Sequence, residues 1–325
     1  MRESDTSGYG PFMRLQGRAI AVLVVVLVLA GVAFFVAVRW RPQPLEQAPA
    51  GQVFCGPDGR LTSKQPIQSH RSYCILLRSD LNALKPNTPF RLVFSIIDDR
   101  GERLRRFATV HEKQMHLIVV RRDLDNFQHL HPTFNETTRE FTLDSVTFPS
   151  NGPYRVFADF TPAEGQIGPS GELLGATPWM DMTVGDTTGF RMQALGAAEL
   201  RQEIGEYTVG LRTPKRPSAG DEAMLRFVIE RGGQPVTDLE PYLGALGHAV
   251  VLREGDLEFL HAHAVEQKAS SQTGEIDIAV HFRMPGRYKA FVQFQHKRRV
   301  LTAAFVLPTV EEGSEEAAQP HGGAH

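Results

Sequence analysis

The sequence has few cysteines and lacks the motifs of the common nucleotide-binding and hydrolytic enzymes. It contains two cysteines, Cys55 and Cys74, without a CxxC spacing, so a dense disulfide framework is not indicated. No GxxxxGK[ST] loop and no GxSxG turn occurs, which leaves P-loop and α/β-hydrolase chemistry without support. The formal net charge of -2 gives no basic excess. Nucleic acid is therefore not an expected partner.

Long apolar runs are also absent, except for one near the N-terminus. Residues 19–38 contain no charge and are long enough to cross a bilayer as a helix. The run exceeds a typical signal-peptide core and ends in Arg-Trp-Arg-Pro, which favours an uncleaved anchor. Three arginines precede the run and two, Arg39 and Arg41, follow it directly, so we expect residues 1–18 in the cytoplasm and the remainder outside. The lipid bilayer is thus a predicted partner of this single-pass protein.

The segment that follows the apolar run, residues 39–70, is rich in Pro, Gln and Gly and indicates a stalk or loop. Cys55 lies within it and Cys74 just beyond it. In an oxidising compartment the two can form one disulfide. Two unpaired thiols, or a metal-binding pair, are the alternatives.

Beyond this segment the chain is a series of short β-type runs separated by turn residues. This pattern predicts an all-β fold, a sandwich rather than alternating βα units. We expect two tandem immunoglobulin-like β-sandwich domains, at residues 71–187 and 205–308. Residues 188–204 are a linker whose polar, Ala-rich part can form a short helix. Residues 309–325, which are acidic and contain two histidines, are expected to be a disordered tail.

The most informative regularity is an internal repeat. The strings FRLVFSIID, MHLIVVRRDLDNFQHLH and GPYRVFADF correspond to LRFVIERGG, GHAVVLREGDLEFLHAH and GRYKAFVQF further along the chain. In the central block of both copies, the second and third histidines follow the first by 13 and 15 residues. The positions that align without a gap are His116, Phe127, His129 and His131 with His248, Phe259, His261 and His263.

A β-hairpin explains this spacing. His116 begins one strand, a polar turn at residues 121–125 reverses the chain, and the next strand carries His129 and His131. Residues two apart on a strand project from the same face, and side chains opposed across the strands lie about 4.5–5.5 Å apart at Cβ. We therefore expect three imidazoles to converge at one end of each sandwich, with Phe127 in the core.

Three histidines with an open coordination position suit a transition metal. The predicted cofactor is a copper or zinc ion, and the predicted role is metal sequestration or transfer, with a metal-transfer protein as a second partner. An enzyme is not expected, because no motif places a general base. The alternative is a structural or protein-interaction module in which the histidines only stabilise the hairpins. Further candidate ligands are His111, Met115, Asp159 and His296.

The strings MHLIVVRRDL…F-x-H-x-HP and LGALGHAVVLREGDLEFLHAH resemble those of bacterial secreted or membrane-anchored proteins related to the YtkA-like group. The resemblance covers residues 70–308. It implies tandem immunoglobulin-like sandwiches and an association with copper or heavy-metal handling. The chain departs from it at Ala264, which follows His263 where the first copy has Pro132. Its cysteines also lack the Cys-Pro-Met-His type of segment of some relatives.

Overall fold

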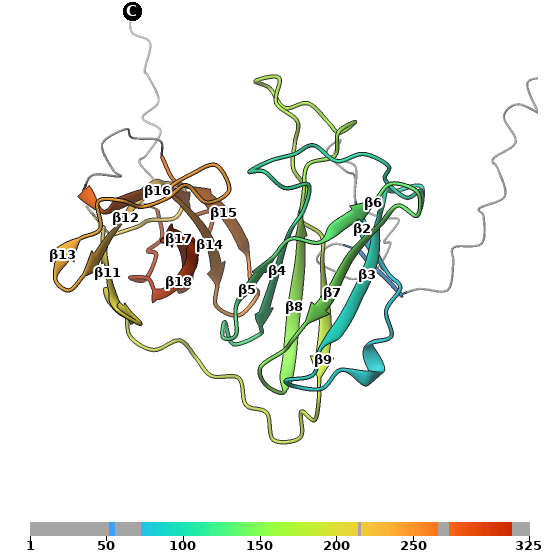
Figure 1. The fold of residues 1–325 in the computed structure, drawn as a ribbon, viewed down its shortest axis with the longest axis horizontal. Coiled ribbons are helices and arrows are strands. Elements are labelled where there is room, and N and C mark those ends of the chain that lie inside the picture. The colour runs from blue at the N-terminus through green and yellow to red at the C-terminus, as the bar shows by residue number, and fades with distance from the viewer. Residues whose placement is uncertain (1–51, 56–72, 214–215, 266–272, 314–325) are drawn as a thin grey trace, which may run out of the picture. The chain divides into compact units, whose positions relative to one another are not determined.

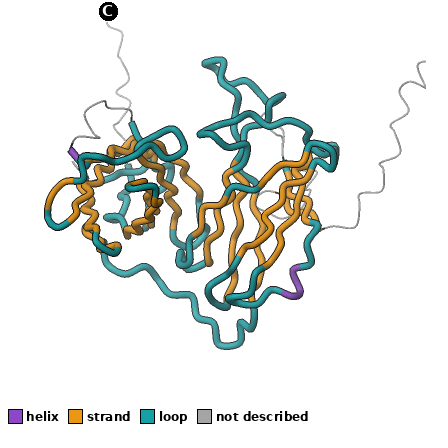
Figure 2. Tube along the Cα trace, viewed as in Figure 1, coloured by secondary structure: helices purple, strands orange, loops and turns teal. Residues whose placement is uncertain are grey.

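The computed structural model describes residues 52–55, 73–213, 216–265 and 273–313. The predicted anchor at residues 19–38 and most of the predicted tail lie outside these ranges. Within them, no helix combines the length and the apolar character needed to cross a bilayer. Strands and loops make up nearly all of the described chain (Figure 2), and η1 (Leu81–Ala83) is a single 3-10 turn. The predicted all-β fold is confirmed.

Among the described residues, the N-terminal half of the chain forms two antiparallel sheets (Figure 1). One has the order β1-β2-β3-β7-β6 and the other the order β5-β4-β8-β9. Phe94 of β3, Leu117 of β4 and Tyr154 of β8 are fully buried in the cluster that these sheets enclose. The strands are β1 (Gln52–Cys55), β2 (Cys74–Leu77), β3 (Phe90–Ile97), β4 (His116–Arg121), β5 (Gln128–Leu130), β6 (Thr133–Asn135), β7 (Glu140–Val146), β8 (Gly152–Asp159) and β9 (Trp179–Val184).

The described part of the C-terminal half also forms two antiparallel sheets, around a cluster of its own. One sheet runs β10-β11-β12-β13, with β16 also paired to β12, and the other has the order β15-β14-β17-β18. Phe227, Val251 and Phe305 are fully buried between them. The strands are β10 (Arg201–Ile204), β11 (Tyr207–Arg212), β12 (Glu222–Arg231), β13 (Gln234–Pro235), β14 (Gly247–Arg253), β15 (Phe259–His263), β16 (Glu275–His281), β17 (Tyr288–His296) and β18 (Arg299–Val306).

Both halves contain a tyrosine corner, a hydrogen bond typical of immunoglobulin-like sandwiches. The hydroxyl of Tyr154, near the start of β8, donates to the carbonyl oxygen of Ser150 at 2.9 Å. The hydroxyl of Tyr288, at the start of β17, donates to the carbonyl oxygen of Met284 at 2.7 Å. Both rings are fully buried, so burial of each polar tip is compensated by the backbone four residues earlier.

A third apolar cluster lies where the two halves meet. Strand alternation sends Leu117 into the N-terminal core but turns Ile118 to the opposite face, where it meets residues of β14 and β17. The contact is reciprocal: Phe127 stacks on Phe291 with ring centroids 4.2 Å apart, and Phe259 lies 5.2 Å from Phe157. Phe127, expected in the core of its own sandwich, therefore belongs to this shared cluster. The buried members of the shared cluster are Ile118, Val120, Leu124 and Phe157 from the N-terminal half, Val250, Leu252, Leu257, Phe291 and Val306 from the C-terminal half, and Leu195.

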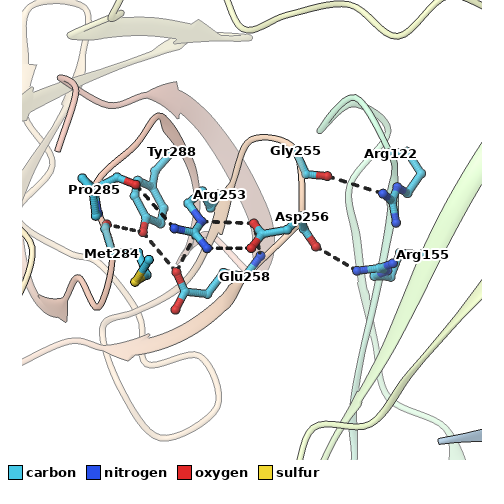
Figure 3. A network of polar contacts seen from close by, with 9 residues as sticks. All are labelled: Arg122, Arg155, Arg253, Gly255, Asp256, Glu258, Met284, Pro285 and Tyr288. Atoms are coloured by element: carbon cyan, nitrogen blue, oxygen red, sulfur yellow. Dashed lines mark hydrogen bonds and ion pairs between the residues drawn. The ribbon is translucent and has the colours of Figure 1, made fainter. Parts of the chain in front are cut away.

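Polar contacts also join the two halves, and Figure 3 shows those made by Arg122 and Arg155. Arg155 of β8 donates to the carbonyl oxygen of Asp256 at 2.9 Å, and Arg122 reaches that of Gly255 at 3.4 Å. In the opposite direction, the ammonium of Lys289 lies 3.7 Å from a carboxylate oxygen of Asp125. Each hairpin turn is thus held by a cation from the other half. This is the pattern of an isologous two-fold contact, here formed within one chain.

The segment between the halves differs from the expectation of a short helix. Residues 201–204 form β10, which pairs with β11 through Ile204 and Tyr207. The two residues between these partners include Gly205 with φ 59°, and such two-residue turns favour a hairpin. The hairpin adds strand pairing and tertiary contacts, which outweigh weak helix propensity.

The two cysteines lie on neighbouring, paired strands. Cys55 and Cys74 are register partners on β1 and β2. Cys74 is buried and disulfide-bonded.

Candidate metal centre

The β4–β5 hairpin gathers His116, His129 and His131. The register pairs Ile118 with His129 and Leu117 with Leu130, so the three histidines lie on the face that turns toward the C-terminal half. Each offers one ring nitrogen, and the three nitrogens all lie within 4.8 Å of one another. His116 is buried, while His129 and His131 are partly buried. The convergence predicted from the 13- and 15-residue spacing is present in this hairpin.

The ring positions are close to those of ligands on one ion. Ring centroids lie 5.1 Å apart for His116 and His129, 5.1 Å for His116 and His131, and 4.6 Å for His129 and His131. Nδ1 of His116 is 2.9 Å from Nε2 of His129. Two nitrogens bound to one ion at about 2.0–2.1 Å are separated by about 2.9–3.4 Å, so these two atoms can share an ion with little movement.

The outward-facing nitrogens of His116 and His129 also have hydrogen-bond partners, and these partners influence which nitrogen of each ring carries the proton. Nε2 of His116 lies 3.1 Å from the carbonyl oxygen of Val110, and Nδ1 of His129 lies 2.6 Å from Oε1 of Gln293. Two neutral imidazoles carry two N–H groups. When both donate outward, the facing nitrogens of His116 and His129 present two lone pairs to each other, which a cation between them would stabilise. Outer partners of this kind fix the tautomer of metal-bound histidines.

A second proton arrangement satisfies the same atoms without an ion. Oxygen and nitrogen of a glutamine amide are assigned from their contacts. If the Gln293 amide turns, its NH₂ donates to Nδ1 of His129. Neutral rings then pass hydrogen bonds along the chain from His129 to His116 to Val110. The same heavy-atom positions are therefore compatible with a metal-ready and a metal-free arrangement, which differ by the orientation of the Gln293 amide and by the tautomer of His129.

His131 completes the triplet with a nitrogen that the fold leaves unsatisfied. Its Nε2 is buried and has no hydrogen-bond partner among the described residues. Burial is the largest cause that lowers the pKa of His131 from 6.5 to about 4. The neighbouring positive charges of His116, Lys113 and His248 lower it further, in that order. The ring is thus neutral at pH 7 and keeps a lone pair for a ligand bond.

The second triplet occupies the equivalent backbone positions in the C-terminal half. The register pairs His248 with His263 and Val250 with His261, as Ile118 pairs with His129. The ring of His248 is buried, and its Nε2 lies 3.2 Å from the carbonyl oxygen of Leu243. The side chains of His261 and His263 are outside the description. The backbone therefore places this triplet on the same contact between the halves.

Two of the additional candidates lie at this centre. The ring of His111 lies 6.2 Å from that of His116 and 5.0 Å from that of His248. His111 has φ 47° in a tight turn closed by Val110 and Lys113. Asp159 is the register partner of His116 and accepts a hydrogen bond from Thr177 at 2.8 Å.

The other two candidate ligands, Met115 and His296, make contacts that stabilise the fold. Met115 is buried in the N-terminal core, because the strand turns it away from the histidine face. His296 is buried, where Nδ1 lies 2.7 Å from the hydroxyl of Tyr207 and Nε2 lies 2.9 Å from Asp238. Neither residue belongs to the described three-histidine group.

The roles of Gln293 and Val110 were not foreseen, because both depend on tertiary contacts that leave no local pattern. A cleft of about 260 Å³ also leads to His116 and Asp159. Its lining includes Lys113 and Thr177. Of the three histidines, the cleft is lined by His116.

Solved structures with similarity to this chain are distant. An Escherichia coli alpha-2-macroglobulin activated by trypsin has 11% identity and a TM-score of 0.23, covering 74% of this chain and 16% of its own length. The bacterial integrin-binding protein invasin has 11% identity and a TM-score of 0.20, with 71% and 39% covered. A titin fragment, A168169, has 9% identity and a TM-score of 0.17, with 74% and 98% covered. These scores are too low to carry an argument.

No curated protein matches the chain. One family model matches residues 72–168 and 202–312, one stretch in each half, and its description is a domain of unknown function, DUF8832. This family, and not the YtkA-like group that the motifs resemble, is the one that the match shows. The matched residues make up more than half of the sequence, so the chain belongs to the DUF8832 family.

Proposed function

We propose that this protein binds a transition metal, copper or zinc, at its histidine triplets and holds it for sequestration or for transfer to a partner protein. The observation that carries the proposal is the buried Nε2 of His131, which has no hydrogen-bond partner in the part of the chain that the structure describes. It lies beside the closely facing nitrogens of His116 and His129. A buried polar atom without a partner costs about 1–3 kcal/mol. A ligand bond to a metal is one use that compensates this cost.

The nature of the ligands narrows the choice of metal. Imidazole suits Cu(II) and Zn(II), whereas oxygen ligands suit Mg²⁺ and Ca²⁺. Met115, the one thioether beside the triplet in sequence, is buried in the core, so a Cu(I) site built on it is not part of the proposal. Three protein ligands leave an open position, which suits a metal that is exchanged with a partner.

The proposal includes the location and the duplication. Residues 19–38 anchor the chain with its N-terminus in the cytoplasm, and the β-rich part lies outside the membrane. The disulfide-bonded state of Cys74 supports an oxidising compartment. The equal registers of the two hairpins and the two tyrosine corners support two copies of one immunoglobulin-like sandwich.

A structural role for the histidines is the second candidate, and the contacts with Val110 and Gln293 favour it. In that case the metal-free hydrogen-bonded chain is the functional state, and the sandwiches serve to present surfaces to a partner. Catalysis is not proposed, because no described group is positioned as a general base for a bound water.

Metal uptake by the full chain separates the two candidates. The purified protein is dialysed against Cu(II) or Zn(II), and bound metal is measured for wild type and for the double variant His129→Ala/His131→Ala. The control is His281→Ala, which removes an exposed histidine of β16. We expect the double variant to lose metal that the control retains. Equal uptake by wild type and the double variant would refute the proposal.

A further inference from the structure

One contact of the three-histidine group comes from the other half of the chain. Nδ1 of His129 lies 2.6 Å from Oε1 of Gln293. Gln293 is a buried residue of β17, and its Nε2 donates to the hydroxyl of Thr302 on β18 at 3.1 Å. Both ends of the buried amide are therefore hydrogen-bonded, and one of them reaches a histidine of the candidate metal centre.

This hydrogen bond belongs to a regular series of contacts between β17 and the β4–β5 hairpin. Alternate residues of a strand project from one face, and three alternate residues of β17 each meet an alternate residue of the hairpin. The pairs are Lys289 with Asp125 at 3.7 Å, Phe291 with Phe127 at a ring-centroid distance of 4.2 Å, and Gln293 with His129 at 2.6 Å. Each pair is chemically matched, as an ion pair, an aromatic stack and a hydrogen bond. The series fixes the register in which the hairpin docks on the other half.

The orientation of the amide decides which nitrogen of His129 can bind a metal. With Oε1 of Gln293 toward the neutral ring, the proton lies on Nδ1 of His129 and Nε2 keeps its lone pair. That Nε2 faces Nδ1 of His116 at 2.9 Å. Acceptors behind metal-bound histidines fix the tautomer and the orientation of the ring in this way. Gln293 therefore lies where the outer partner of a metal ligand is expected.

We propose that the metal site of the N-terminal half is completed by the C-terminal half. Gln293 is a positioning residue, which accepts the Nδ1–H of His129 and so keeps Nε2 of that ring available to the ion. The proposal rests on the metal-binding function proposed above, and it concerns the group formed by His116, His129 and His131. It follows that the protein binds its metal tightly only while the two halves are docked.

Docking of the halves and binding of metal then form one linked equilibrium. If docking raises the affinity for the ion by some factor, the bound ion stabilises docking by the same factor. Separation of the halves withdraws Gln293 from His129, and loss of such an outer partner lowers metal affinity by about 10–100-fold. The contact between the halves is thus a means by which the release of the ion can be controlled.

Cu(II) affinities of full-chain variants, measured by competition with a chelator of known affinity, test the role of Gln293. Gln293→Leu removes the acceptor and should raise the Kd by about 10–100-fold. Gln293→Glu keeps an oxygen acceptor for His129, and the Thr302 hydroxyl can donate to the new carboxylate, so this variant should restore most of the affinity. Gln295→Leu is the matched control, because Gln295 bonds Glu240 and not a histidine.

The outcomes separate the positioning role from metal binding itself. Equal Kd values for Gln293→Leu and Gln295→Leu, in a protein that binds Cu(II), would overturn the positioning role and leave the metal-binding function intact. A Gln293→Glu protein as weak as Gln293→Leu would do the same. No bound Cu(II) in wild type would overturn both proposals. Urea unfolding of each variant with chelator present shows whether a loss of affinity is only a loss of folded protein.

Truncation of the shared cluster away from the histidines tests the linkage to docking. Leu252 is fully buried in the shared cluster, whereas Leu225 is fully buried in the core of the C-terminal half. Leu252→Ala should raise the Kd for Cu(II) by about fivefold or more. Leu225→Ala should lower the stability of the fold and leave the Kd of the folded protein unchanged. Equal Kd values for the two variants would contradict the linkage.

Discussion

Replacing His131 by leucine should stabilise the metal-free protein and abolish its response to metal. The buried Nε2 has no hydrogen-bond partner within the described ranges, and removing such an atom recovers about 1–3 kcal/mol. The change also loses two ring contacts, with His116 and His129, each worth about 0.5–1.5 kcal/mol. These two amounts are of similar size, but leucine also buries apolar atoms, worth about 0.8 kcal/mol per CH₂, where the imidazole buried polar ones. The net effect with a chelator present is therefore a gain of about 1 kcal/mol.

Metal reverses this order. At a free metal concentration of about one hundred times Kd, wild type gains about 2.7 kcal/mol. His131→Leu has lost a ligand and gains far less. For a protein of this size, each kcal/mol of stabilisation raises Tm by about 2–4 °C. The wild-type Tm should therefore rise by about 5–10 °C on adding metal. The two Tm values therefore cross between chelator and metal.

Thermal unfolding of wild type and His131→Leu, each with chelator and with Cu(II), is the assay. His281→Leu is the control, since it removes an exposed imidazole outside the cluster. Two outcomes would refute the ligand role of His131. One is a His131→Leu protein that is less stable than wild type in chelator by 1 kcal/mol or more, and the other is an equal response of both proteins to Cu(II). Such a result would make the imidazole a structural group.

Three further predictions concern the metal-free fold. Because the pKa of folded His131 is lowered to about 4, its neutral form contributes stability that is complete above about pH 6.5 and lost as the pH falls toward 4. The loss is at most about 3 kcal/mol, and chelator-treated His131→Leu should lack this part of the pH dependence in urea titrations. Phe291→Ala truncates a ring that is 3% exposed and stacked on Phe127; equilibrium unfolding should show a loss of about 3 kcal/mol, and a loss below 1 would argue against the packed contact. Reduction of the disulfide at Cys74 should lower stability by about 3 kcal/mol for a loop of roughly twenty residues, while Cu(II) uptake by the folded fraction stays unchanged.

Local patterns were sufficient to predict the hairpins and the strand content. β3 (Phe90–Ile97) coincides with the string FRLVFSIID, and β8 and β17 coincide with the strings GPYRVFADF and GRYKAFVQF. The His116–His129 spacing gave the hairpin, because register in a short hairpin is set by the length of its turn. The convergence of the first triplet follows from that register alone.

The surroundings of the triplet could not be predicted in the same way. A His-x-His pattern shows that two side chains share a face, but not whether that face meets the core, the solvent or another domain. Phe127 was therefore expected in its own core, whereas it stacks on Phe291 from the other half. Gln293 contacts His129 across 164 positions of sequence, and no periodicity reports such a pair. Residues 201–212 form a hairpin, whereas a short Ala-rich helix was expected to end at residue 204. Strand pairing and tertiary contacts stabilise the hairpin, and the local sequence does not report them.

Anomalous diffraction from crystals of the Cu(II)-loaded full chain tests the central claim most directly. We predict an anomalous peak within about 2.0–2.1 Å of ring nitrogens from His116, His129 and His131, with Gln293 behind His129. Copper bound only elsewhere, or no copper while the three rings remain in hydrogen bonds to one another, would contradict the claim.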